Sequence, residues 1–169
     1  MPQQRLLLFD NNGDATLQWS NAKEPALIHW WNGYSAEMDF TNPAAVEWYS
    51  SQLKKMQNEY GVDGFKLDAG DMEYYPATSV SYKKATPNEQ CEAWGSFGLM
   101  YPLNGYRAMW KMGGAPLAER LRDKGHNWED LKTLVPNLTV AGLLGYPFTC
   151  PDMIGGGEFG SFIGRNKLE

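Results

Sequence analysis

One short segment, GVDGFKLD at residues 61–68, constrains the fold more than any other part of the chain. Side chains alternate between the two faces of a strand, so Phe65 and Leu67 are predicted to share one apolar face. Lys66 and Asp68 are then predicted on the opposite face, as an ammonium and a carboxylate two residues apart. The next three residues, Ala-Gly-Asp, are typical of a loop, so the strand is predicted to end on Asp68.

A helix is predicted immediately before this strand. Asn42 is a favourable N-cap, Pro43 suits the first helical position, and apolar residues recur at steps of three and four up to Tyr60. Gly61 stands where a glycine commonly ends a helix. A helix, a short loop and a strand form the second half of a βαβ unit, which predicts an α/β protein with a parallel sheet.

Two later segments repeat the pattern of a strand that ends on a carboxylate. They are residues 117–123 and 146–152, which end on Asp123 and Asp152. The carboxyl ends of the strands in a parallel α/β barrel meet at one face. We therefore expect both acids to lie near Asp68, at the face where such barrels carry their catalytic groups.

Helices and one long loop are predicted between these strands. Asn127 can cap a helix that closes at Gly145, with a kink at Pro136, and residues 90–113 are predicted to contain another helix. Residues 71–90 are polar and loop-like. A long loop after a barrel strand often shapes a substrate cleft, and a tolerated insertion is the alternative.

Composition narrows the class of partner. The 169 residues carry a formal net charge of −5 with scattered Lys and Arg, which argues against nucleic acid. No apolar run is long enough to span a bilayer, and the apolar part of the amino terminus is too short for a signal peptide. The compartment stays open, cytoplasm or periplasm for a bacterial protein. Two His and two Cys form no metal-binding pattern, so no cofactor is expected.

The aromatic content points to a carbohydrate ligand. Seven Trp and nine Tyr exceed what packing requires, and the C–H faces of sugars lie well on aromatic rings. Trp31 is a candidate for such stacking, and a place in the core is the alternative. Asp71 is predicted to cap a turn rather than to line the cleft, and His126 is interpreted as ordinary loop polarity.

Two carboxylates that face each other across a sugar suit glycoside hydrolysis. Their separation sets the stereochemistry, roughly 5–5.5 Å for retention and roughly 6.5–9.5 Å for inversion. Lys66 and Arg107 could keep Asp68 ionised. The alternatives for Asp68 are a helix N-cap or a structural ion pair with Lys66. Three converging acids could also bind magnesium, as in a metal-dependent barrel lyase.

The order of four sequence blocks resembles glycoside hydrolase family 31. The blocks are DFTNP at residues 39–43, GVDGFKLD at 61–68, WEDL with GLLG at 128–131 and 142–145, and PDMIGG at 151–156. The resemblance implies a (β/α)₈ TIM barrel and a retaining α-glycosidase that works by two Asp. It implies that Asp68 is the nucleophile and Asp123 the acid/base, with Arg107 and Asp152 in contact with the sugar.

Two departures from the α-glucosidases of the family favour another substrate. Lys66 stands where those enzymes have Trp, and Arg122-Asp123-Lys124 replaces Gly-Asp-Asn. Both features resemble the branch of the family that contains an α-galactosidase, and the Lys66 ammonium could bind hydroxyls that a Trp would exclude. We therefore expect α-galactosides as substrates. An α-glucosidase, an α-xylosidase or an inactive sugar-binding remnant are the alternatives.

The length predicts an incomplete barrel. A complete barrel of this type has roughly 250 residues, whereas this chain has 169. We expect residues 1–169 to be a fragment of the catalytic domain with about five of the eight strands, from the third to the seventh. The sequence leaves open whether the chain is active alone, and whether it oligomerises.

Overall fold

A four-stranded parallel sheet lies at the centre of the computed structural model, which describes residues 6–30, 33–153 and 155–157. Its strands follow the order β4-β6-β7-β8, and every neighbouring pair is parallel. They are β4 (Lys66–Leu67), β6 (Gly105–Tyr106), β7 (Ala118–Arg120) and β8 (Thr149–Cys150). The α/β class is confirmed. The described residues place four strands in this sheet, so the assignment of five strands as the third to the seventh is not confirmed.

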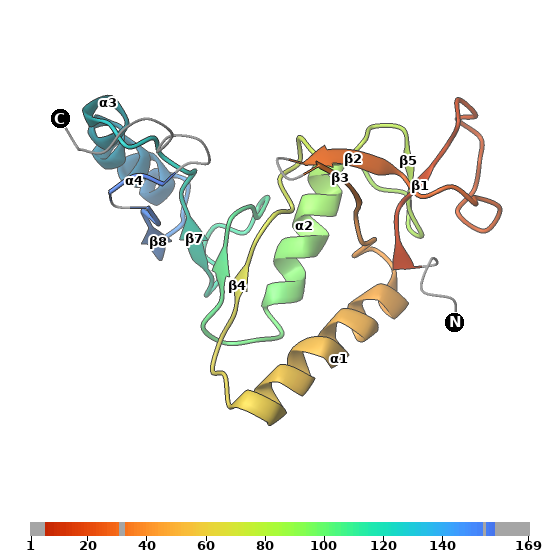
Figure 1. Cartoon of the computed structure of the whole chain (residues 1–169), viewed down its shortest axis with the longest axis horizontal. Helices are drawn as coiled ribbons and strands as arrows, with labels where there is room; N and C mark the ends of the chain where they lie inside the picture. The colour runs from red at the N-terminus through yellow and green to blue at the C-terminus, as the bar shows by residue number, and fades with distance from the viewer. Residues whose placement is uncertain (1–5, 31–32, 154, 158–169) are drawn as a thin grey trace.

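Four further strands form two small antiparallel sheets beside α2, at the end of the molecule away from α3 and α4 (Figure 1). One pairs β1 with β5, and the other is a hairpin of β2 and β3. Their bounds are Phe9–Asp10 for β1, Leu27–Trp30 for β2, Gly33–Ala36 for β3 and Ser79–Val80 for β5. Trp30 of the hairpin lines the same cavity as Asp68, which directly follows β4.

Helix α1 (Pro43–Tyr60) has the predicted bounds and caps. The Asn42 Oδ1 atom accepts a hydrogen bond from the backbone N–H of Ala44 at 3.0 Å. Gly61 ends the helix with a φ of 66°, which a residue with a Cβ adopts only at a cost. The chain then runs directly into β4, as predicted, although the paired part of this strand is shorter than residues 61–68.

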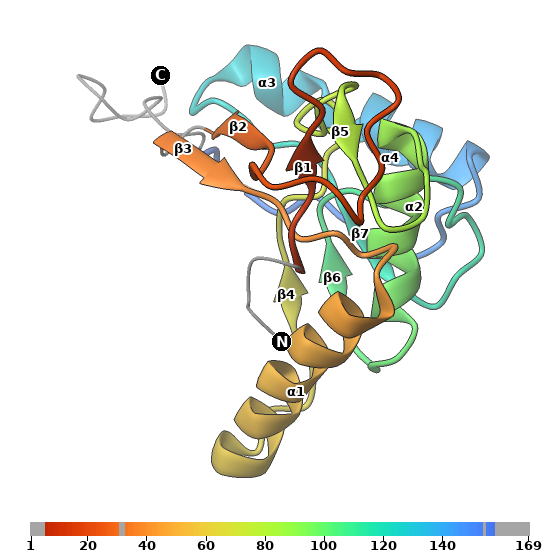
Figure 2. The ribbon, with the colours of Figure 1, turned by 90° about the vertical axis from the view of Figure 1, so that its right-hand side faces the viewer.

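Helix α2 (Pro87–Gly98) begins earlier than predicted. Thr86 and Glu89 form a capping box, in which each side chain accepts a hydrogen bond from the backbone N–H of the other residue. This Thr-x-x-Glu spacing is a sequence signal that the prediction of a helix within residues 90–113 did not use. In Figure 2, α1 and α2 lie close to β4 and β6.

The main core fills the space between these two helices and the sheet. Tyr106 of β6 is fully buried, and its hydroxyl donates to the carbonyl of Trp94 at 2.8 Å. Gly98 permits this contact, since a Cβ there would lie 2.3 Å from the Tyr106 ring. The buried members of this core are Leu53, Leu67, Trp94, Phe97, Tyr101, Tyr106, Met109, Met112 and Leu117.

The predicted long helix after Asn127 is two helices, α3 (Trp128–Lys132) and α4 (Leu134–Leu143). The break falls at Thr133 and not at the predicted kink, Pro136. Pro136 is the third residue of α4, where its missing N–H has no intrahelical partner to lose. Asn127 caps α3 as predicted, through a hydrogen bond from the Asp130 N–H at 2.8 Å. Within the described ranges, no helix combines the length and the apolar character that crossing a membrane requires.

Candidate active site

Asp68 directly follows β4 at the carboxyl edge of the parallel sheet. The predicted alternation is confirmed, because Leu67 is buried in the core and Lys66 is exposed. The Asp68 side chain is 57% exposed, so solvent or a ligand can reach its carboxylate.

Arg120, the last residue of β7, joins two of the predicted acids. Its Nη2 atom donates to Asp68 Oδ1 at 2.5 Å, and its Nη1 atom donates to Asp152 Oδ2 at 3.2 Å. The Arg120 side chain is 8% exposed, so these carboxylates balance the charge of a buried cation. The predicted convergence of Asp68 and Asp152 is therefore observed, through a residue that the sequence analysis did not select.

The position of the strand end explains why Arg120 was missed. The prediction extended the strand to Asp123, which puts Arg120 and Asp123 on opposite faces. In the structure β7 ends at Arg120, so this residue stands at the edge of the sheet beside Asp68. A cation inside a predicted barrel strand was the available signal, since such a charge needs an acidic partner when buried.

Lys66 and Arg107 contact acids other than Asp68. Lys66 Nζ lies 3.6 Å from Asp152 Oδ1, which corrects the alternative of an ion pair between Lys66 and Asp68. Asp152 adopts a φ of 60°, a conformation that Asp tolerates better than most residues. Arg120 therefore supplies the favourable charge at Asp68 that the sequence analysis assigned to Lys66 and Arg107.

A second ionic cluster contains the predicted acid/base. Arg107, directly after β6, pairs with Asp123 Oδ2 at 3.3 Å and with Asp71 Oδ2 at 3.0 Å. Asp71 was predicted to cap a turn, and its carboxylate is instead an ion-pair partner of Arg107. In the part of the chain that the structure describes, no three His, Cys, Asp or Glu side chains gather to hold a metal ion.

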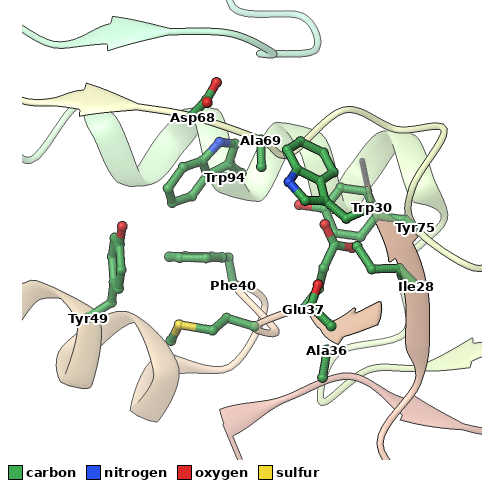
Figure 3. Close-up of a pocket in the computed structure, with 13 residues that line it drawn as sticks. Ile28, Trp30, Ala36, Glu37, Phe40, Tyr49, Asp68, Ala69, Tyr75 and Trp94 are labelled. Carbon is green, nitrogen blue, oxygen red and sulfur yellow. The ribbon is translucent and has the colours of Figure 1, made fainter. Parts of the chain in front are cut away.

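A cavity of about 410 Å³ opens beside Asp68 (Figure 3). Five aromatic residues line it, from the hairpin, the segment between β3 and α1, the two long helices and the loop after β4: Trp30, Phe40, Tyr49, Tyr75 and Trp94. Trp31 lies outside the described residues, so its stacking role stays a prediction. Its neighbour Trp30 lines the cavity, and the choice between these two adjacent residues depended on the hairpin register.

Glu37 is the second carboxylate of the cavity, after Asp68. Burial raises the pKa of Glu37 to about 7, and the negative charge of Asp71 adds to the shift. Sequence reasoning missed this residue, because nothing in its local pattern indicates that Glu37, directly after the hairpin, lines the same cavity as Asp68.

The fold and this arrangement of charges define a class of protein. A parallel sheet with acids at its carboxyl edge, beside an aromatic cavity, is the organisation of a TIM-barrel glycosidase domain. The sequence model described as the Glycosyl hydrolases family 31 TIM-barrel domain matches residues 3–117. The chain belongs to this family of glycoside hydrolases.

Individual relatives agree with this assignment. The mouse myogenesis-regulating glycosidase is 35% identical over 144 residues, which are 78% of this chain and 19% of the relative. The alpha-xylosidase XylQ of Lactiplantibacillus pentosus is 41% identical over 76 residues, 45% of this chain and 8% of that enzyme. A family 31 sulfoquinovosidase from E. rectale superposes with a TM-score of 0.70 at 21% identity, over 89% of this chain and 23% of that one. The chain thus spans about a fifth of the length of the mouse relative.

Proposed function

We propose that this chain is part of the catalytic domain of a retaining α-glycosidase, with Asp68 as the nucleophile and Asp123 as the acid/base. One observation carries the proposal. Asp68 is exposed at the carboxyl edge of the sheet, and Arg120 holds its Oδ1 atom at 2.5 Å. A carboxylate with one oxygen fixed in this way presents the other oxygen for attack in a defined direction.

The reaction follows from two carboxylates with alternating tasks. The free oxygen of Asp68 attacks the anomeric carbon while Asp123 gives its proton to the departing glycosidic oxygen, so that a glycosyl ester forms and the aglycone leaves. Asp123 then takes a proton from water, and the water oxygen attacks the anomeric carbon and releases Asp68. Two inversions at this carbon give net retention.

The Asp123 carboxylate has an ionic partner and stays accessible. Its partner Arg107 is shared with Asp71, and the contact to Asp123 is the longer of the two, 3.3 Å against 3.0 Å. The Asp123 side chain is also 30% exposed, which leaves access for a leaving group or a water molecule.

The substrate we propose is a terminal α-galactoside. Lys66 supports this choice, since its side chain is 60% exposed and its contact to Asp152 is long, at 3.6 Å. Its ammonium therefore has donors available for sugar hydroxyls. Arg107, Asp152 and Trp31 are proposed as further sugar contacts. The similarity to the alpha-xylosidase XylQ makes an α-xyloside the second candidate.

Chemical rescue tests both acid assignments. The chain is incubated with para-nitrophenyl α-galactoside, α-glucoside and α-xyloside, and the galactoside is expected to turn over fastest. Asp68→Ala should abolish hydrolysis, and added azide should then give the β-galactosyl azide. Asp123→Ala with azide should give the α-galactosyl azide, since the first inversion still takes place on Asp68.

Glu59→Ala, a change at an exposed acid of α1, is the matched control and should behave like the wild type. A fully active Asp68→Ala variant would refute the nucleophile assignment. Faster turnover of the xyloside would replace the galactoside as the proposed substrate and would leave the roles of the two acids intact.

A further inference from the structure

Two buried polar atoms in the Asp68 cavity lack a hydrogen-bond partner within the described part of the chain. They are Oε2 of Glu37 and the indole Nε1 of Trp94. An unpaired buried polar atom is costly, and in native proteins such an atom commonly marks a place where a ligand or water binds. The first atom belongs to a carboxyl group, and the second is a hydrogen-bond donor only.

The surrounding residues hold the Trp94 side chain in place. A Cβ on Gly70 would lie 2.1 Å from Trp94 Cδ1 and 2.5 Å from Nε1, so the backbone of Gly70 lies against the indole. The Phe40 ring centroid is 4.6 Å from that of Trp94. Figure 3 shows the Glu37 carboxylate near Trp30 and Tyr75, and the Trp94 nitrogen turned toward the segment of Asp68.

The chemistry of this lining favours a polyhydroxylated ligand. A hydroxyl group both donates and accepts hydrogen bonds, so a sugar can satisfy Glu37 Oε2 and Trp94 Nε1 at once. The aromatic walls suit the C–H faces of a pyranose ring. A wholly apolar ligand would leave both atoms unpaired, and an anion would meet the negative charge of Asp68. A volume of about 410 Å³ is within the range of small-molecule sites.

We propose that Glu37 and Trp94 bind the sugar directly, with Glu37 Oε2 forming a hydrogen bond to one hydroxyl and Trp94 Nε1 donating to another. This inference rests on the proposed function, because the sugar bound in this way is the substrate whose anomeric carbon faces Asp68. Beside the acids at the carboxyl edge of the sheet, the site then has two contacts that determine specificity, one from the segment between β3 and α1 and one from α2.

The test is calorimetric titration of the full chain with methyl α-galactoside. Trp94→Phe removes the indole N–H and keeps an aromatic ring, and Glu37→Leu removes the carboxylate. Each should weaken binding about fivefold or more, the effect of losing one hydrogen bond to the ligand. Circular dichroism melting of the same samples checks that each variant is folded.

Two control variants match these changes outside the cavity. Glu119→Leu removes another buried carboxylate with an unpaired Oε2, on β7, and Trp48→Phe changes a tryptophan on α1. Both should bind the galactoside like the wild type. The monodeoxy galactosides test the same contacts from the side of the ligand. At least one of them should bind to the wild type about fivefold more weakly than the parent galactoside does. The variant that lacks the partner of the missing hydroxyl should bind this deoxy sugar and the parent galactoside equally.

Each outcome decides between the two proposals. Wild-type affinity in both Trp94→Phe and Glu37→Leu, with turnover of the galactoside intact, overturns the sugar contacts and leaves the proposed function standing. Weaker binding in both variants, together with a wild-type chain that binds the galactoside but does not hydrolyse it, supports the contacts and counts against the catalytic roles of Asp68 and Asp123. A wild-type chain that neither binds nor hydrolyses the galactoside overturns both.

Discussion

The region of α1 and α2 and the region of α3 and α4 differ in how much apolar surface they bury. In the first, Trp94, Phe97 and Tyr106 are at most 5% exposed. In the second, among residues that the structure describes, α3 has no buried residue and α4 has one, Ala141. Leu143 is 82% exposed. The two regions stand at opposite sides of the parallel sheet in Figure 1.

This difference matters because the candidate site uses both regions. Asp68 follows β4, which is anchored in the core of α1 and α2, whereas Asp123 and Asp152 follow strands next to the exposed helices. Arg120 and Arg107 link the two sides through ion pairs to acids from each. The geometry of the acids therefore depends on the hydrophobic core on one side and on charge pairing across the sheet edge.

The largest expected effect on stability tests the contrast directly. Phe97→Ala should lower the free energy of unfolding by about 3–5 kcal/mol, the usual cost of removing a buried aromatic ring. The Phe97 ring stacks on the Trp94 ring, with 5.9 Å between the ring centroids and an interplanar angle of 2°. Leu143→Ala should change it by less than about 0.5 kcal/mol, because its side chain is already in solvent.

Urea denaturation of both variants measures the difference. Equal losses for Phe97→Ala and Leu143→Ala would contradict the contrast between the two regions. They would indicate that the surface of α4 is covered in solution.

The link between the regions is tested at Arg120. Arg120→Met should lower the free energy of unfolding by about 2–3 kcal/mol, because it leaves Asp152 partly buried without its guanidinium. The exposure of Asp68 keeps the loss below that of a fully buried pair. Arg120→Lys is the matched variant: it keeps the charge but cannot reach both acids as a fork does, so it should recover part of the loss.

Activity provides a second measurement for the same pair of variants. If Arg120 positions Asp68, kcat for the galactoside should fall by a larger factor than KM rises in both variants. Arg120→Lys should recover a larger share of the stability than of kcat. A Met variant with wild-type stability and wild-type kcat would show that the two regions are held together by the sheet alone.

The contrast also explains which features the sequence could predict. The caps of α1 at Asn42 and Gly61 and the polarity of β4 depend on neighbours in the sequence, and they were predicted correctly. The Arg120 contact depends on the residue at which β7 ends, and a strand that ends three residues earlier brings different side chains to the edge. The cavity with Glu37 depends on how the hairpin packs beside α2, which a one-dimensional pattern does not contain.

Glu37 predicts a pH dependence of stability. Its pKa in the fold is raised to about 7, above the ordinary value of a glutamate, so the folded chain holds a proton that the unfolded chain releases. This acid therefore destabilises the fold as the pH rises through 7, by linkage. A shift of this size corresponds to up to about 3 kcal/mol, and residual exposure reduces the effect to about 1–2 kcal/mol.

The measurement compares wild type with Glu37→Gln at pH 5 and pH 8. The Gln variant should lose less stability than the wild type between these values, by about 1–2 kcal/mol. Burial also raises the pKa of Asp39 and Glu119, and because both are present in the two proteins, their contributions cancel in the difference. Glu59→Gln, at an exposed position of α1, should follow the wild type. Identical pH profiles for Glu37→Gln and wild type would contradict the burial of this acid.

The smallest expected effects compare one glycine from each region. Gly61 at the end of α1 has a φ of 66° and free space around its missing Cβ, so Gly61→Ala should cost about 1 kcal/mol through backbone strain alone. Gly142 in α4 also has free space, but its φ is helical, so Gly142→Ala should stabilise by about 0.5–1 kcal/mol. Thermal melts should therefore shift in opposite directions. Stabilisation by Gly61→Ala would mean that α1 does not end in the left-handed conformation that leads the chain into β4 and places Asp68 at the sheet edge.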